Sequence, residues 1–149
     1  MVILCIDTDI YITNCEDSRA IASFNFGTRT TTITTDHKPN EPKETKRIKS
    51  KGGNVYLTIP KSASLDSDNG NFHKGTYRIN PGHLSVSRSF GDIDIKEETF
   101  GGIKGILMAT PELFKVNIIK DSIDYMLIGC NGIFNRIHDE EIFTWIWDI

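Results

Sequence analysis

The stretch IYITNCEDSRAIASF, residues 10–24, places two apolar segments on either side of a short polar turn. Residues 10–13 and 20–24 are rich in Ile, Ala and Phe, a composition typical of half-buried β-strands. The turn between them, EDSR, carries Asp17 directly after the first strand. A carboxylate at a strand end is well placed for a metal ion or a phosphate, although Asp-Ser also forms ordinary turns.

Strand-like segments recur along the chain on both sides of this stretch. Residues 2–6 are expected to form a hairpin with residues 10–13 through the polar turn at residues 7–9. Further strands are predicted at residues 29–34, 55–59, 77–79, 84–86, 106–109, 114–119 and 125–130. Helices are predicted at residues 44–51 and from His138 onward. A pattern of about eight to ten strands and two helices predicts an α+β fold with mainly antiparallel sheets, arranged as a sandwich.

The composition excludes several classes of protein. The chain has 149 residues and a net charge of -3, whereas a nucleic-acid-binding surface usually shows a basic excess. Its longest apolar runs have about six residues, against the roughly 20 that a membrane span needs, so neither nucleic acid nor membrane is an expected partner. The N-terminal MVILCIDTD does not resemble a secretory signal, and a cytoplasmic or nuclear location is expected. Cys5, Cys15 and Cys130 form no CxxC pair, which argues against a zinc site or a disulfide framework.

Both ends of the chain are apolar. Residues 2–6 open it, and at helical spacing Ile142, Trp145, Ile146 and Ile149 share one face near its end. Apolar faces of this kind need partners. The two ends could cover each other, but we expect that they pack on domain segments outside this chain or on a second copy.

Other polar clusters have both a chemical and a structural interpretation. His37, in DHKPN, is a candidate for acid–base chemistry, but a turn held by side-chain hydrogen bonds is favoured. Ser87 is a candidate nucleophile without a GxSxG elbow around it. Cys130 follows a strand, but no electropositive group beside it is evident that would activate the thiol, which favours a structural role.

Two segments stand out by composition. Residues 60–75 are rich in Ser, Asp, Asn and Gly and are predicted to form an inserted loop. The helix predicted at residues 44–51 belongs to a basic stretch made by Lys43, Lys46, Arg47, Lys49 and Lys51. A solvated helix face is favoured there over a ligand site.

The order and spacing of these blocks carry more information than any block alone. EDSRA, TTDHKPNEPKETKRIKSKGG, YRINPGHLSVSRSFGD, ATPEL, YMLIGCNGIFN and HDEEI follow one another over residues 10–145. This order resembles the protein phosphatase 2C family, the PPM-type metal-dependent Ser/Thr phosphatases. The resemblance implies two antiparallel β-sheets in a sandwich flanked by helices. It also implies two Mn²⁺ or Mg²⁺ ions, which activate a water that attacks phosphoserine or phosphothreonine.

Three positions match metal ligands of that family. Asp17 matches the aspartate of the family's GDSR block, which serves an additional metal position. Asn131 stands where the family has an aspartate of the core metal site, and Asn135 stands where it has a further ligand of the additional metal. The resemblance assigns the remaining motif residues to the scaffold: Ser18, Arg19, Asp36, His37, Arg88, Gly91, Asp92 and Gly132.

Parts of the family pattern do not occur in the sequence. The Asp-Gly-His-Gly-Gly segment, whose aspartate bridges the two metals, and the C-terminal Asp-Asn segment are both missing. We therefore expect residues 1–149 to be the central part of a phosphatase 2C-like domain, incomplete at both ends, with a flap-like loop at about residues 60–75. No catalytic site is expected to be intact, and Mn²⁺ or Mg²⁺ binding is expected to be weak or absent.

These expectations leave three functional hypotheses. The first is a catalytically inactive pseudophosphatase that binds a phosphoprotein or another partner protein. The second is an active phosphatase whose missing segments come from a longer transcript or a second chain, and the asparagine at position 131 argues against it. The third is a non-enzymatic β-rich scaffold descended from the family.

Overall fold

The computed structural model describes residues 1–59 and 75–148. Ile149 and nearly all of the loop expected at residues 60–75 lie outside the described residues. The chain divides into two compact units, one made of Met1–Asp36 with Thr110–Ile149 and the other of His37–Ala109. Each unit has its own cluster of buried hydrophobic side chains.

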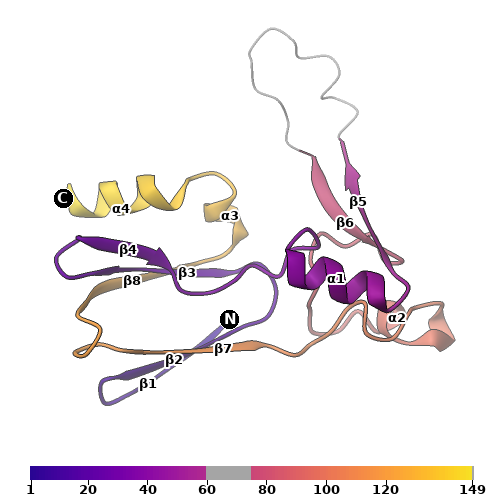
Figure 1. Ribbon diagram of the computed structural model, residues 1–149, viewed down its shortest axis with the longest axis horizontal. Helices are drawn as coiled ribbons and strands as arrows, with labels where there is room; N and C mark the ends of the chain where they lie inside the picture. Colours follow the sequence, from indigo (N-terminus) through magenta and orange to yellow (C-terminus); the bar gives the residue numbers. More distant parts are fainter. Residues whose placement is uncertain (60–74, 149) are drawn as a thin grey trace, which may run out of the picture. The chain divides into compact units, whose positions relative to one another are not determined.

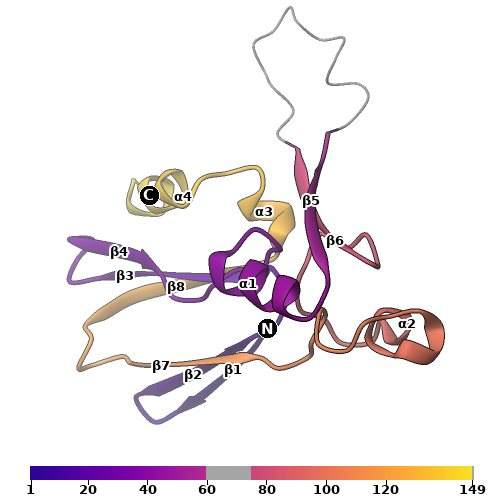
Figure 2. The ribbon, with the colours of Figure 1, turned by 45° about the vertical axis from the view of Figure 1, so that its right-hand side comes forward.

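The first unit contains two three-stranded antiparallel sheets and two helices. One sheet has the order β1-β2-β7, and the other has the order β4-β3-β8. The elements are β1 (Val2–Ile6), β2 (Asp9–Asn14), β3 (Arg19–Phe24), β4 (Arg29–Thr32), β7 (Glu112–Asn117), β8 (Ile123–Gly129), α3 (Asn131–Phe134) and α4 (Asp139–Trp147). Figure 1 and Figure 2 show α4 on one side of the β4-β3-β8 sheet and the other sheet on the opposite side. This arrangement confirms the α+β class and the antiparallel sheets.

Strand β3 is buried on both of its faces because it lies between α4 and the β1-β2-β7 sheet. Ile21 packs against Ile142 and Phe143 of α4. Ala20 and Ala22, which are fully buried, point to the opposite face because successive side chains of a strand alternate. The small alanine side chains allow the two sheets to approach closely at this point.

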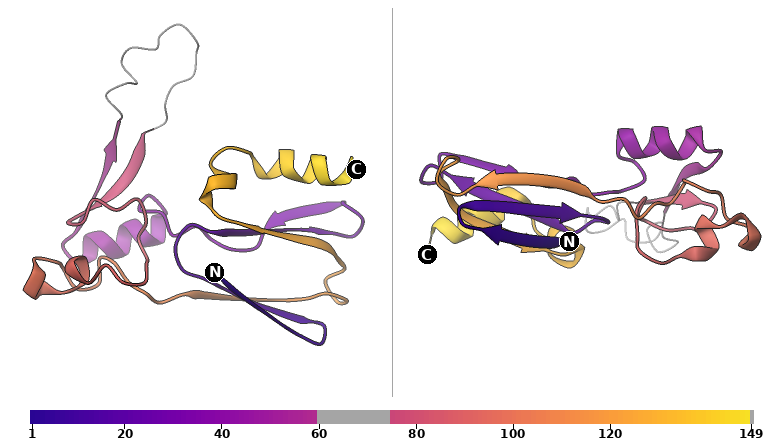
Figure 3. Two further views of the ribbon diagram at one scale, coloured as in Figure 1. Left: turned by 180° about the vertical axis from the view of Figure 1, so that it is seen from behind. Right: turned by 90° about the horizontal axis from the view of Figure 1, so that it is seen from below.

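The hairpin predicted near the N-terminus forms as expected. β1 pairs with β2, and Figure 3 shows this pair beside β7. On β2, Ile10, Ile12 and Asn14 are buried while the residues between them are partly exposed. This alternation is that of a strand with a single core-facing side.

The apolar face predicted for the C-terminal helix is partly wrong. α4 buries Ile142 and Phe143, whereas Trp145 is 55% exposed. Because Ile142 and Phe143 together centre the buried stripe, Trp145 falls on its rim rather than within it. The indole N–H of Trp147 donates to the hydroxyl of Ser23 at 3.2 Å, which anchors the end of the helix on β3.

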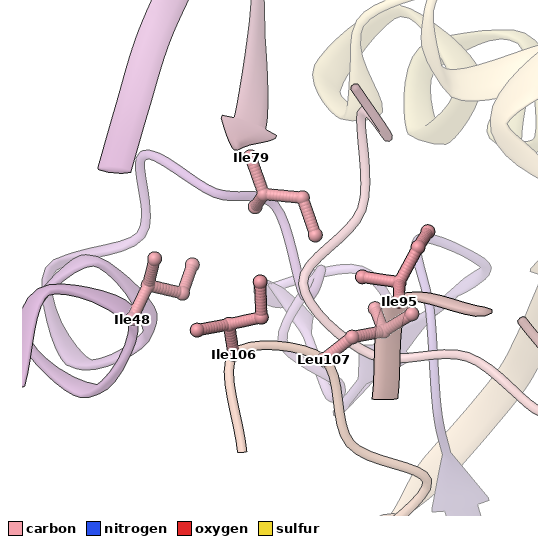
Figure 4. Close-up of a cluster of buried hydrophobic side chains, with 5 residues drawn as sticks. All are labelled: Ile48, Ile79, Ile95, Ile106 and Leu107. Carbon is pink, nitrogen blue, oxygen red and sulfur yellow. The ribbon is translucent and has the colours of Figure 1, made fainter. Parts of the chain in front are cut away.

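The second unit combines helices with one antiparallel strand pair, β5-β6. Its elements are α1 (Pro42–Ser50), β5 (Asn54–Thr58), β6 (Thr76–Asn80), α2 (Ile93–Lys96) and the 3-10 helix η2 (Glu98–Phe100). Its core is a cluster of Ile48, Ile79, Ile95, Ile106 and Leu107 (Figure 4). No helix in the described ranges is both long and apolar enough to cross a membrane.

Two strands predicted for this unit do not form. Residues 84–86 and 106–109 lie in irregular backbone, and only isolated bridges such as Arg88↔Met108 connect them to neighbours. Ile106 and Leu107 were interpreted as strand residues because they are apolar, but they enter the core from a loop. Gly105, with a φ of 89°, turns the chain sharply before them, so no continuous ladder can form.

A buried carboxylate joins α1 to two loops of the second unit. Glu44 is 3% exposed, and its oxygens accept hydrogen bonds from Arg88 at 2.7 Å and from Arg47 at 2.8 Å. The hydroxyl of Ser87 lies 2.7 Å from the same carboxylate. Arg47 also donates to the carbonyl of Ile106 at 3.0 Å, so its predicted solvated position is wrong. Burial alone would raise the pKa of Glu44, but these hydrogen bonds outweigh burial and lower it to about 2.

Replacing Glu44 with glutamine is expected to destabilise the second unit by about 3 to 5 kcal/mol, because two partly buried guanidinium groups lose their counter-charge. Urea unfolding at pH 7 measures this change. Glu98→Gln, an exposed position in the same unit, is the matched control. A loss no larger than that of the control would show that the buried network contributes nothing.

The same network predicts acid sensitivity. The pKa of Glu44 in the folded chain, about 2, lies below its ordinary value of 4.5. Its contribution to stability is therefore complete above about pH 4.5 and is lost as the pH falls toward 2. Urea unfolding from pH 6 to pH 3 is expected to show a decline in stability that is smaller in Glu44→Gln.

Candidate functional site

The candidate site is built where the β2–β3 turn meets the start of α3. The side-chain amide of Asn131 donates to Oδ2 of Asp17 at 3.1 Å. Asp17 is 8% exposed, while Asn131 is exposed at the first position of α3. Asn135 follows one helical turn later, and its backbone N–H donates to the carbonyl of Asn131 at 2.9 Å. The structure thus brings Asp17 and Asn131 together and places Asn135, also exposed, at the C-cap of the same helix.

Asn131 and Gly132 follow β8 after one intervening residue, Cys130. These residues begin α3, a helix of four residues. The carbonyl of Cys130 accepts the backbone N–H of Ile133 at 3.1 Å and so closes the first helical turn. Cys130 itself is exposed beside the site, although the sequence favours a buried structural cysteine at this position.

A buried amide shapes the turn that carries Asp17. Asn14 donates from Nδ2 to the carbonyl of Thr35 at 3.0 Å and to that of Glu16 at 3.3 Å. Glu16 adopts a left-handed backbone with a φ of 95°, at the position where the related family has glycine. The sequence analysis did not single out Asn14. Its only signal was a polar residue at a core-facing position of a strand.

Arg19 fixes the surroundings of the turn. Its Nε and Nη2 donate to the two oxygens of Asp36 at 3.0 and 2.8 Å, and its Nη1 donates to Asp139 at 2.6 Å. The guanidinium also lies over the ring of Phe134, 4.9 Å from its centroid. The hydrogen bond to Asp36 is the main cause that raises the pKa of Arg19 above its ordinary value. One side chain thereby connects β3, the segment after β4, α3 and α4.

Ser18 and Gly132 belong to the first unit, whereas His37, Arg88, Gly91 and Asp92 lie in the second unit. His37 is 1% exposed, and its carbonyl accepts the backbone N–H of Ser87 at 2.8 Å. The Ser87 hydroxyl is buried against Glu44, so it is not accessible as a nucleophile. Asp92 accepts a hydrogen bond from the hydroxyl of Ser89, directly after Gly91 with its φ of 79°.

Glu44 is a second residue that the sequence analysis missed. It was interpreted only as the start of a helix, whereas it binds Arg88, one of the expected scaffold residues. The available signal was the pairing of a glutamate with Arg47 at a spacing of three residues, on the side of the helix that carries Ile48.

The donors at the candidate site do not fit a pair of divalent cations. Mn²⁺ and Mg²⁺ are held in proteins mainly by carboxylate oxygens. Here Asp17 is the one carboxylate among the three expected positions, and the other two, Asn131 and Asn135, are neutral amides. In residues 1–59 and 75–148 no group of three His, Cys, Asp or Glu side chains could hold a metal ion. Catalysis through a metal-bound water therefore cannot be derived from these residues.

Arg19 provides a direct test of how the site is supported. Arg19→Lys is expected to cost about 1 to 3 kcal/mol in stability, because an ammonium group cannot reproduce the bidentate bond to Asp36 while also reaching Asp139. Urea unfolding measures the change, and Arg136→Lys, at an exposed position of the same unit, is the control. Equal stability of the two variants would contradict the supporting role of Arg19.

Comparison with known proteins places these features in a family. Residues 1–148 match the family PP2C, protein phosphatase 2C. The chain is 27% identical over 146 residues to "Probable protein phosphatase 2C 42" of Oryza sativa subsp. japonica, covering 97% of this chain and 36% of the relative. It is 30% identical over 146 residues to "Probable protein phosphatase 2C 6" of Paramecium tetraurelia, covering 97% of this chain and 42% of the relative.

Solved structures show the same fold. A serine-threonine phosphatase 2C from Toxoplasma gondii matches with a TM-score of 0.67 at 18% identity, covering 95% of this chain and 43% of that one. A C. elegans sex determining protein matches with a TM-score of 0.68 at 19% identity, covering 93% and 28%. The chain spans less than half the length of these relatives. The family match over nearly the whole sequence shows that this chain belongs to the protein phosphatase 2C family.

Proposed function

We propose that this chain is a catalytically inactive member of the protein phosphatase 2C family, a pseudophosphatase that binds a phosphoprotein or another partner protein. The observation that carries the proposal is the hydrogen bond from the Asn131 amide to Asp17. The Asn131 N–H donates to an oxygen of Asp17 that, by the family resemblance, would face a metal ion. The pair is satisfied by itself and needs no cation.

The loss of charge at position 131 has a large effect on metal affinity. Exchanging a carboxylate for an amide removes a full negative charge next to a divalent cation and leaves only a carbonyl dipole. A difference of about 3 kcal/mol in binding energy corresponds to roughly two tenfold steps in affinity. Asn135 adds a second exchange of the same kind. Weak or absent Mn²⁺ or Mg²⁺ binding follows from these two exchanges.

The scaffold around the lost ligands supports a binding role. Arg19 still connects four segments around the site, and Asp17 remains held by Asn131. These polar networks hold the surface around Asp17 in a fixed arrangement, as a binding site requires. Three cysteines at positions 5, 15 and 130, far apart in the sequence and without a CxxC pair, support a reducing compartment, the cytoplasm or the nucleus, as the place of action.

Mn²⁺-dependent hydrolysis of a phosphothreonine peptide tests the proposal. We expect no turnover by the wild-type chain. Titration calorimetry with Mn²⁺ is expected to show that Asn131→Asp/Asn135→Asp binds the ion at least about tenfold more tightly, because two carboxylates return beside Asp17. Asn40→Asp/Asn54→Asp, at exposed positions of the second unit, is the control with the same change in charge.

Turnover by the wild-type chain that Asp17→Ala abolishes would overturn the proposal and favour an active Mn²⁺- or Mg²⁺-dependent phosphatase. Equal Mn²⁺ affinity in the site variant and the control would show that the two asparagines do not determine metal binding.

Fluorescence anisotropy with the same phosphopeptide separates a binding role from an inert scaffold. Binding that is lost in Arg19→Gln but kept in Arg136→Gln is the expected result.

A further inference from the structure

The outward side of α1 carries positive charge only. Lys43, Lys46 and Lys49 are exposed on the helix, and Lys51 is exposed at its C-cap. The acidic residue within α1, Glu44, is turned into the core. The helix therefore presents these lysines to solvent and keeps its one carboxylate inside.

This arrangement works against the stability of the helix. Lys43 and Lys46, and likewise Lys46 and Lys49, are three residues apart, a spacing at which like charges repel. Lys43 also lies in the first turn, where the helix dipole disfavours a cation. In the described part of the chain, none of these lysines forms an ion pair that would offset the repulsion. Repulsion that lowers the stability of the helix, with no contact that offsets it, indicates a functional surface.

The composition of the surface selects the kind of partner. α1 exposes no aromatic side chain on which the bases of a single-stranded nucleic acid could stack. It exposes no large aliphatic side chain that could enter a lipid surface, because its single isoleucine, Ile48, is buried. Arg47 is bound to the Glu44 carboxylate and to backbone carbonyls, so the lysines are the cations that α1 offers to a partner. Their ammonium groups act as point charges and attract carboxylates that are spread along a chain.

We propose that the surface formed by Lys43, Lys46 and Lys49 is a docking site for an acidic, Asp/Glu-rich peptide segment of a partner protein. From Lys43 to Lys49 the helix rises about 9 Å at 1.5 Å per residue. An extended peptide covers that length with about three residues. A segment with three or four closely spaced carboxylates therefore matches the row of lysines. This inference is independent of the metal site, which lies in the other unit.

Fluorescence anisotropy with a labelled peptide of eight alternating Glu and Gly residues tests the site on the full chain. We expect binding at about 50 mM salt that weakens severalfold at about 200 mM, because exposed charges are screened. Lys43→Gln/Lys46→Gln is expected to raise the Kd about tenfold. The variant removes like-charge repulsion within α1, so its Tm is expected to equal or exceed that of the wild type.

The control is Lys120→Gln/Arg136→Gln, two exposed positions of the other unit that change the net charge by the same amount. Its Kd is expected to stay within about twofold of the wild type. Equal weakening in both double variants, or no binding of the peptide at low salt, would overturn the proposal. Tighter binding of a single-stranded RNA oligonucleotide, or of vesicles containing phosphatidylserine, than of the peptide would also overturn it.

Discussion

The guanidinium of Arg19 is the constraint on which the candidate site depends. This planar cation forms ion pairs with two carboxylates, those of Asp36 and Asp139, which belong to segments far apart in the sequence. Because the five N–H groups of arginine are fixed in one plane, the two carboxylates are fixed relative to β3 as well. The start of α4 and the segment after β4 are thereby held beside the turn that carries Asp17. In the second unit the charges are reversed. The buried carboxylate of Glu44 forms ion pairs with two guanidinium groups, those of Arg47 and Arg88.

Under the proposed function, these two networks keep the family scaffold in place while the metal chemistry is lost. The charges that hold loops together are separate from the charges that would hold metal ions. Exchanging a metal ligand for asparagine leaves the Arg19 network unaltered, and at position 131 the new amide even supplies a hydrogen bond to Asp17. The exchange therefore costs the fold little and the metal affinity much.

The charged side chains of α1 and α4 are arranged differently along the two helices. Along α1 the acidic residue is used inside the unit and the lysines are left outside, whereas the first turn of α4 carries Asp139, Glu140 and Glu141. The acids at α4 agree with the helix dipole, but Lys43 at the start of α1 does not. The fold accounts for the charges of α4 and, in α1, for Arg47 and for Lys49 in the last turn, but not for Lys43 and Lys46. These two lysines are therefore the charges that point to a partner.

The sequence by itself determined the fold class, the N-terminal hairpin and the family, because alternating apolar residues and spaced motif blocks are local properties that need no tertiary contact. It also identified Asp17, Asn131 and Arg19. Only the tertiary structure decided that Glu44 is buried, that Trp145 lies on a rim and that residues 106–109 enter the core without forming a strand. These outcomes depend on what covers each side chain. A neighbour can come from any distance along the chain, and no local pattern records which one it is.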